Sequence, residues 1–372
     1  MAECRIWDLV HVVEDPRREQ GRRHKLGDIF ALTICSVICG AEHWTHIEEF
    51  GKTNEEWFRT FLSLSHGVPS HDTIGRVFAA LDPDVFERVF QTWTQALAAN
   101  DASRHVAIDG KTLRRSFDRA NAKAAIHMVS AWAVHNRVCF GQVKVDGKSN
   151  EITAIPKLLR QLSLKDTTVT IDAIGCQHKI AEQINKQGGF WLFCLKGNQH
   201  ALHDDVRLYF EDMLDNGRLQ GAETCTTTEK GHGRIETRLC CVDTRIGWLR
   251  KRHDWKGLSY IAVVETQRTL DKLTSKERRY FIGSEPQPDI EAVARIVRDH
   301  WQVENSLHWQ LDVSFGEDDC RVRIGNAAEN LSRVRRLALA LLKKETTVKI
   351  GVKGKRLKAG WDRDYLIKVL TI

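Results

Sequence analysis

The segment His105-Val106-Ala107-Ile108-Asp109-Gly110-Lys111 is an apolar, β-branched run that ends on an aspartate. A second run of this kind, Thr167-Thr168-Val169-Thr170-Ile171-Asp172-Ala173-Ile174-Gly175, ends on Asp172. A half-buried carboxylate must be paired or bound to a metal, so an apolar strand that ends on an acid indicates a site. Two such strand ends could hold a divalent cation, because Mg²⁺ prefers a few carboxylate oxygens. The other interpretation is that each aspartate only caps a turn or the next helix.

The hydrophobic period changes along the chain around these two segments. Residues 1 to about 100 have helical periodicity, whereas the residues from 105 onward alternate with period two. The expected order from there is strand, strand, strand, helix, strand, helix, strand. Such an order predicts a mixed sheet with helices on its faces. It matches the ribonuclease H-like fold, in which the first and fourth strands are neighbours, so Asp109 and Asp172 should lie close together.

The predicted fold class is therefore α/β, a ribonuclease H-like mixed sheet with a β-rich insertion, preceded by an all-helical N-terminal domain. We expect the helical domain over 1–102, the sheet domain over 103–342 with the insertion at about 200–290, and a basic C-terminal tail over 343–372. The net charge is +7, and residues 343–372 hold nine basic and three acidic side chains. Such a tail can bind a phosphate backbone, although a solvated arm has the same composition.

Composition and cysteine spacing exclude several classes of protein. The 372 residues include ten cysteines, none in a Cys-x2-Cys pair or another zinc-type spacing, which favours buried thiols in a reducing cytoplasm. The polar N-terminus has no signal-peptide core. The longest apolar run, from Ile29 to Ala41, is too short to span a bilayer, so no membrane partner is expected.

A third carboxylate is expected on a helix that begins near Asp289. His300, Glu304 and His308 are spaced by four on this helix and should share one face, which could point Glu304 at the strand-end aspartates. The same residues could instead form a zinc site, or the histidines could be solvated beside packed tryptophans. The remaining candidates for a third acid follow them closely: Asp312, Glu317, Asp318 and Asp319.

Several basic residues are candidates for contacts with DNA. A helix entered through Pro69-Ser70 could be the second helix of a helix-turn-helix and would offer Arg76, although many helical hairpins bind no DNA. The Gly-rich turn from Lys230 to Arg234 could bind phosphate, or it could be a plain hairpin loop. The other candidates follow strands, flank the third acid or lie in the basic tail: Lys111, Arg114, Lys196, His300, Lys353, Lys355 and Arg356.

Ordered sequence blocks extend over nearly the whole chain. They are His24-Lys25-Leu26 through Ala41-Glu42, Val68-Pro69-Ser70-His71-Asp72-Thr73-Ile74, Ala107 to Arg114, Lys148 to Pro156, Asp172 to Gln177, Leu195-Lys196-Gly197-Asn198-Gln199, and His300-Trp301-Gln302-Val303-Glu304-Asn305 through Leu311-Asp312-Val313. In these blocks the chain resembles bacterial insertion-sequence transposases of the DDE class, most closely the H-repeat-associated type.

The resemblance implies that Asp109, Asp172 and Glu304 are the three catalytic, metal-binding acids. It implies two Mg²⁺ ions, for which Mn²⁺ could substitute. The sequence departs from the family in one place. Many relatives in the wider DDE group carry Tyr-x2-Arg-x3-Glu-x6-Lys around the third acid, and this chain has Val297, His300, Glu304 and Leu311 there. The resemblance therefore assigns no role to His300.

The function expected from this resemblance is a DNA transposase that binds the ends of an insertion sequence and catalyses metal-dependent strand cleavage and strand transfer. Its partner would be double-stranded DNA, both terminal inverted repeats and target, bound by a homodimer in the bacterial cytoplasm at the nucleoid. The alternative is a non-transposing descendant that acts as a metal-dependent DNA nuclease or as a DNA-binding protein.

Overall fold

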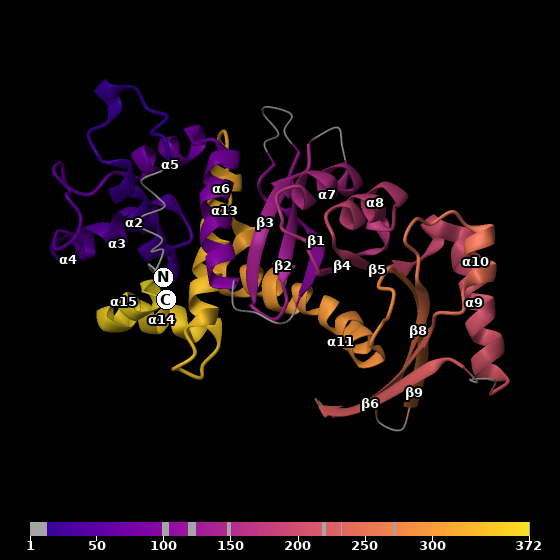
Figure 1. The fold of residues 1–372 in the computed structure, drawn as a ribbon. Coiled ribbons are helices and arrows are strands. Elements are labelled where there is room, and N and C mark those ends of the chain that lie inside the picture. The colour runs from indigo at the N-terminus through magenta and orange to yellow at the C-terminus, as the bar shows by residue number, and fades with distance from the viewer. Residues whose placement is uncertain are drawn as a thin grey trace. The chain divides into compact units, whose positions relative to one another are not determined.

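The computed structural model describes residues 13–98, 104–117, 124–146, 150–217, 221–231, 233–270 and 273–371. The chain forms two compact units, each assembled from segments that are distant in sequence (Figure 1). The first unit comprises Met1–Ala102, Gly110–Ser149 and Glu304–Ile372, and the second comprises Ser103–Asp109 and Asn150–Val303. Strand β1 (His105–Leu113) is divided, because its residues up to Asp109 belong to the second unit and the rest to the first.

The first unit is mostly helical. Its α-helices are α2 (Leu26–Ile38), α3 (Trp44–Thr53), α4 (Glu55–Phe58), α5 (His71–Ala80), α6 (Pro83–Ala98), α12 (Trp309–Phe315), α13 (Ala327–Lys344), α14 (Val352–Trp361) and α15 (Arg363–Leu370). The short turns η1 (Glu19–Gly21), η4 (Glu304–His308) and η5 (Glu317–Asp319) also belong to it. The antiparallel hairpin of β2 (Ile126–Ala133) and β3 (Val138–Lys144) lies beside β1, in the order β3-β2-β1.

Local sequence signals set the beginnings of two of these helices. The Ser70 hydroxyl accepts a hydrogen bond of 3.3 Å from the backbone N–H of Thr73, which makes Ser70 the N-cap of α5. Helix α6 begins at Pro83, and the carboxylate of Asp82 accepts a 2.8 Å hydrogen bond from the N–H of Asp84.

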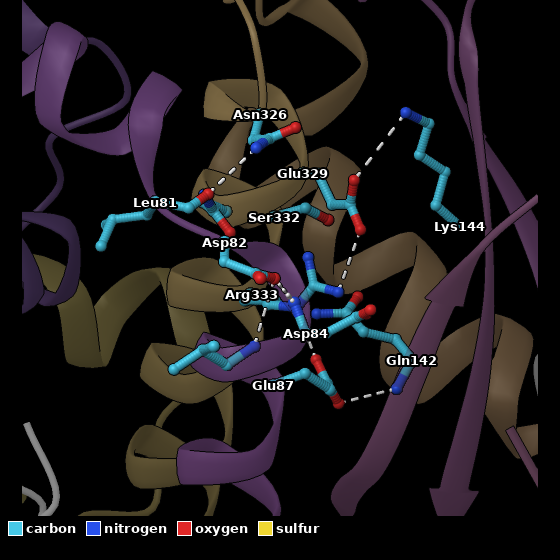
Figure 2. A network of polar contacts seen from close by, with 12 residues as sticks. Leu81, Asp82, Asp84, Glu87, Gln142, Lys144, Asn326, Glu329, Ser332 and Arg333 are labelled. Carbon is cyan, nitrogen blue, oxygen red and sulfur yellow. Dashed lines mark hydrogen bonds and ion pairs between the residues drawn. The ribbon is translucent and has the colours of Figure 1, made fainter. Parts of the chain in front are cut away.

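Helix α13 lies at the centre of the first unit and packs against α2, α5, α6 and β3. Its Arg333 side chain, only 1% exposed, donates to Glu87 of α6 at 2.6 Å and to Glu329 one turn earlier at 3.0 Å. Glu87 also accepts the backbone N–H of Gln142 in β3 at 2.9 Å (Figure 2). These buried charges are tolerated because each one has a charged or hydrogen-bonded partner.

The C-terminal basic segment is folded, whereas the sequence suggested a tail. Arg356 of α14 donates to the carbonyl of Val37, in the last turn of α2, at 2.8 Å, and also to the carbonyl of Ser314. Lys355 donates to the carbonyl of Leu342, in the last turn of α13, at 2.9 Å. The last carbonyls of a helix lack intrahelical partners and favour cations, so these basic residues complete two helix ends.

The second unit is built on a mixed sheet. Its strands are the first part of β1, β4 (Thr168–Ile171), β5 (Phe190–Leu195), β6 (Glu223–Gly231), β7 (Arg234–Asp243), β8 (Tyr260–Leu270) and β9 (Leu273–Gly283). Their order is β1-β4-β5-β9-β8-β7-β6, in which β1, β4 and β5 are parallel and every later pair is antiparallel. The parallel pairing of β1 with β4 confirms the neighbourhood predicted from the element order, while β6 was not predicted.

Helices and 3-10 turns complete the second unit. They are α7 (Glu151–Leu159), η2 (Ala173–Gly175), α8 (His178–Lys186), η3 (Gly197–Gln199), α9 (His200–Asp215), α10 (Gly247–Arg252) and α11 (Ile290–His300). Helix α11 places Val293 and Val297 against a buried face that includes Leu192 of β5 and Phe281 of β9. No helix of the described residues is long and apolar enough to cross a membrane.

Candidate active site

Asp109 and Asp172 stand at equivalent positions of two neighbouring strands. In the parallel pair of β1 and β4, Ile108 lies opposite Ile171, and each aspartate is the next residue of its chain. The strands before them are buried, whereas Asp109 is half-buried and the Asp172 side chain is 57% exposed. The second unit thus brings together two acids that are far apart in sequence, as the strand order predicted.

The turn that carries Asp172 is held by the loop after β5. The side-chain amide of Asn198 donates to the carbonyl of Ala173 at 2.7 Å, and that of Gln199 donates to the carbonyl of Cys176 at 2.9 Å. Lys196 of the same loop places its ammonium 3.9 Å from the Asp172 carboxylate and is 62% exposed. Sequence reasoning gave no role to Asn198 and Gln199, although the motif from Leu195 to Gln199 was a signal for one.

A pocket of about 270 Å³ opens in the second unit beside Asp172. Residues in or just after β4, β5 and α11 line it together with residues of α9 and β9, and we call it the β4 pocket. Its charged and polar lining is Thr170, Asp172, Lys196, His203, Glu277, Arg278, Arg279 and His300. Trp301, also in the lining, is 53% exposed, and the guanidinium of Arg279 lies 4.7 Å from its ring centroid. The β4 pocket therefore combines cations, one carboxylate of the predicted site and an exposed aromatic surface.

His300, predicted to flank the third acid, lies in the wall of this pocket. Its Nδ1 is 2.9 Å from the hydroxyl of Thr170. Burial lowers the pKa of His300 to about 4, against the opposing effect of Asp172, so the imidazole is neutral at neutral pH.

Glu304 begins a π-helical turn, η4, in the first unit, where the sequence pattern predicted a continuous α-helix. Its side chain is 60% exposed, and His308 Nδ1 lies 3.4 Å from its carboxylate. Burial lowers the pKa of His308 to about 3. Lys343 of α13 donates to the carbonyl of Ser306 in the middle of the turn. Single π turns inside helices are frequent at functional sites, which fits a turn that presents an acid.

The competing candidates for the third acid are all paired with cations of the first unit. Lys111 Nζ lies 2.7 Å from Asp312 and 3.3 Å from Asp318, and its side chain is 8% exposed. Glu317 is fully buried against Arg336, at 3.2 Å. Asp319 pairs with Arg115 at 3.3 Å. By contrast, no lysine or arginine of the described residues pairs with Glu304, which makes it the available carboxylate of this stretch.

The predicted DNA-contacting residues divide by exposure. Lys111, Lys355 and Arg356 are buried, and their side chains donate to groups inside the first unit. The exposed ones are Arg76, Arg114, Lys196, Arg234 and Lys353. Arg114 lies 3.1 Å from Asp318 with 78% of its side chain exposed, and Arg234 lies 3.4 Å from Glu236 with 49% exposed.

Comparisons with known proteins identify a family for this chain. Residues 100–341 match the Transposase DDE domain family, and residues 7–94 match a DDE_Tnp_1-associated domain. The chain is 41% identical over 374 residues to the H repeat-associated putative transposase YhhI of Escherichia coli (strain K12), covering 99% of this chain and 98% of that protein. It is also 41% identical over 371 residues to the putative transposase YncI of Escherichia coli O157:H7, covering 98% and 94%.

One solved structure, that of the piggyBac transposase synaptic complex with hairpin DNA, has a TM-score of 0.41 and 10% identity over 98% of this chain and 79% of that one. The family match and the relatives aligned along nearly their whole length show that the chain belongs to the transposases with a DDE domain.

Proposed function

We propose that this transposase binds the ends of an insertion sequence and catalyses metal-dependent DNA strand cleavage followed by strand transfer. Asp109, Asp172 and Glu304 are the catalytic acids of the proposal. The observation that supports it is the position of Asp109 and Asp172, which directly follow Ile108 and Ile171, two residues paired with each other in neighbouring parallel strands. Glu304 joins them because it is the acid of its stretch with no lysine or arginine partner among the described residues.

The fold proposed for the catalytic part is ribonuclease H-like. Strand β1 belongs to two strand orders, β3-β2-β1 and β1-β4-β5. Strands β2 and β3 are antiparallel to each other, whereas β1, β4 and β5 are parallel. This is the strand order expected for such a sheet. The antiparallel strands β6 to β9 are then the insertion, which joins the sheet through β9 beside β5.

The donor set fits a hard divalent cation. The carboxylates of Asp172 and Glu304 are more than half exposed, and carboxylate oxygens are the ligands that Mg²⁺ and Mn²⁺ prefer. We propose that the three acids hold two such ions, which when bound would activate an attacking hydroxyl and stabilise the leaving oxygen. The loop from Lys196 to Gln199 holds the Asp172 turn in place, so the protein contributes position as well as charge.

The proposed partner is double-stranded DNA, at terminal inverted repeats and at the target, bound by a homodimer in the bacterial cytoplasm at the nucleoid. Exposed cations are the candidates for backbone contacts, namely Arg76, Arg114, Lys196, Arg234 and Lys353. Lys111, Lys355 and Arg356 are left out of this surface, because their charges already bind groups of the folded chain.

The test is cleavage of terminal-repeat DNA by Asp109→Asn, Asp172→Asn and Glu304→Gln, measured separately in Mg²⁺. Each change removes the charge but keeps the shape, so nicking should fall on the order of a hundredfold or more while DNA affinity stays near that of the parent. Asp319→Asn, an exposed acid of the same stretch, is the matched control and should cleave normally. Unimpaired nicking in any of the three variants removes that residue from the site.

A second assay separates transposition from simple nuclease action. A pre-cut element end, an acceptor plasmid and Mg²⁺ or Mn²⁺ are mixed with the protein. A transposase joins the 3′-end to the plasmid, whereas a nuclease or a DNA-binding descendant yields no joined product.

A further inference from the structure

Three side chains of the second unit form a continuous chain of hydrogen bonds beneath the β4 pocket. His105 of β1 places Nε2 2.8 Å from the hydroxyl of Thr170 in β4. The same hydroxyl lies 2.9 Å from Nδ1 of His300 at the end of α11. A hydroxyl has one proton, so it can donate to only one of the two rings. The chain of bonds must therefore be ordered if each pair is a true hydrogen bond.

The interior end of this chain determines its direction. His105 is only 5% exposed, and its Nδ1 is buried with no hydrogen-bond partner among the described residues. Orphaned buried N–H donors are rare in proteins, because the lost hydrogen bond to water is costly. The favoured tautomer of His105 therefore leaves Nδ1 bare and carries its proton on Nε2, which donates to Thr170.

The rest follows from the single proton of the hydroxyl. Thr170 accepts from His105 and donates to Nδ1 of His300, which leaves the proton of the His300 ring on Nε2. The reverse direction would bury an unpaired N–H of His105. That cost, at the interior end of the chain of hydrogen bonds, sets its direction.

His300 lines the β4 pocket, and among the described residues the hydrogen bond of its ring is the one between Nδ1 and Thr170. We propose that His105 and Thr170 are positioning residues that fix His300 as the Nε2–H tautomer, and that this N–H is a neutral hydrogen-bond donor to a phosphate oxygen of DNA bound in the β4 pocket. The inference rests on the proposed function, because it takes the ligand to be DNA.

A neutral donor at this place does what a lysine cannot. Lys196, 62% exposed, provides a mobile charge beside Asp172. The His300 ring is held by Thr170, so its N–H donor has a fixed direction. The ring is uncharged, so it does not compete with metal ions for the acidic side chains. Burial keeps its ring uncharged by lowering its pKa to about 4. The two residues should therefore contribute to DNA binding in ways that differ in salt dependence, because only a charge releases counterions.

The tautomers can be read directly in the DNA-free protein. Long-range proton–nitrogen correlations on ¹⁵N-histidine-labelled protein distinguish protonated from bare ring nitrogens. We expect both His105 and His300 to carry the proton on Nε2. In Thr170→Val, which keeps the shape but removes the hydroxyl, His300 should become a mixture of tautomers. Thr167→Val is the control, since Thr167 is a buried threonine beside the same strand whose hydroxyl donates to the carbonyl of Lys165 at 3.2 Å, and it should leave both spectra unchanged. A His300 protonated on Nδ1 in the parent protein would overturn the inference, whatever the activity.

The phosphate contact is tested by binding of a fluorescent duplex from the element end at several salt concentrations, in EDTA to prevent cleavage. Loss of one hydrogen bond to a charged oxygen should weaken binding about tenfold in His300→Phe, with an unchanged salt slope. Lys196→Met should instead reduce the slope by about one. His300→Gln, whose amide can replace the N–H donor, should regain part of the loss. Parental affinity in His300→Phe, or a slope lowered as in Lys196→Met, would refute the contact while leaving the cleavage tests of the three acids unaffected.

Discussion

Replacement of Glu87 by alanine should destabilise this protein strongly, although Glu87 lies outside the candidate site. Its carboxylate binds the guanidinium of Arg333 at 2.6 Å and the backbone N–H of Gln142 at 2.9 Å (Figure 2). The side chains of Glu87 and Arg333 are 3% and 1% exposed, so water cannot replace the lost partner. The variant leaves a buried cation with Glu329 as its remaining carboxylate, at 3.0 Å.

The size of the expected loss of stability follows from the buried guanidinium of Arg333, which loses one of its two carboxylate partners. Removing one partner of a buried ion pair costs about 3–5 kcal/mol, and the retained Glu329 puts Glu87→Ala at about 3 kcal/mol. Removal of the cation as well should recover part of this cost. The double variant Glu87→Ala with Arg333→Met has no unpaired guanidinium at this place, because both partners of the ion pair are removed. Glu329 still has a cationic partner, since Lys144 lies 3.9 Å from it. The double variant should therefore be more stable than the sum of the single changes predicts.

The assay is urea unfolding followed by tryptophan fluorescence, since the fully buried Trp93 lies on the same helix as Glu87. The control is Glu55→Ala, which breaks an exposed pair with Arg59 of 2.6 Å and should cost less than about 1 kcal/mol. A loss in Glu87→Ala no larger than in this control would refute the reasoning. So would a double variant whose loss equals the sum of the two single losses, because the cost would then come from packing and not from the orphaned charge.

Two further predictions concern a turn and a titration. Gly175→Ala should reduce nicking more than DNA binding, because the new Cβ would lie 2.2 Å from the Ile171 side chain and displace the turn that begins after Asp172. Gly197→Ala is the control, because its Cβ would enter open space. Equal nicking activity of the two variants would contradict this prediction. Burial would raise the pKa of Glu345, but hydrogen bonds from Thr347 and Tyr365 hold that pKa at about 2, below the ordinary 4.5. The lowered pKa contributes about 3 kcal/mol to the free energy of unfolding above pH 4.5, and this contribution is lost as the pH falls toward about 2. Glu345→Gln should flatten the urea midpoint across that window, and an unchanged pH profile would refute the assignment.

The sequence predicts the parts of this site that depend on strand order. Asp109 and Asp172 were expected together because two apolar runs end on them and parallel neighbours share one edge. Strand β4 does end at Ile171, but β1 continues past Asp109 to Leu113. The sequence could not predict the π turn at Glu304, because the hydrophobic residues from Val293 to Leu311 keep a helical period through it. Nor could it show which cations are available, since Lys111 pairs with an aspartate 201 residues away.

Partners that are distant in sequence also explain why the segment predicted as a basic tail folds into helices α14 and α15. Net charge counts residues, but DNA binding depends on which charges are exposed. Arg356 and Lys355 are bound to carbonyls at the ends of α2 and α13, so their contribution is to the fold. A solvated arm and a folded helix can have the same basic composition, so the sequence does not distinguish them until the carbonyl partners of the basic residues are known.

Two of the three proposed acids lie where the chain passes from one unit to the other. Asp109 is the last residue of the second unit in β1, and Glu304 is the first residue of the first unit after α11. Each unit is stabilised by its own contacts, with the Glu87 cluster in the first and the loop after β5 in the second. Cleavage therefore requires both units to be folded, and Glu87→Ala should lose cleavage in step with its folded fraction, unlike Glu304→Gln, which should lose it while fully folded.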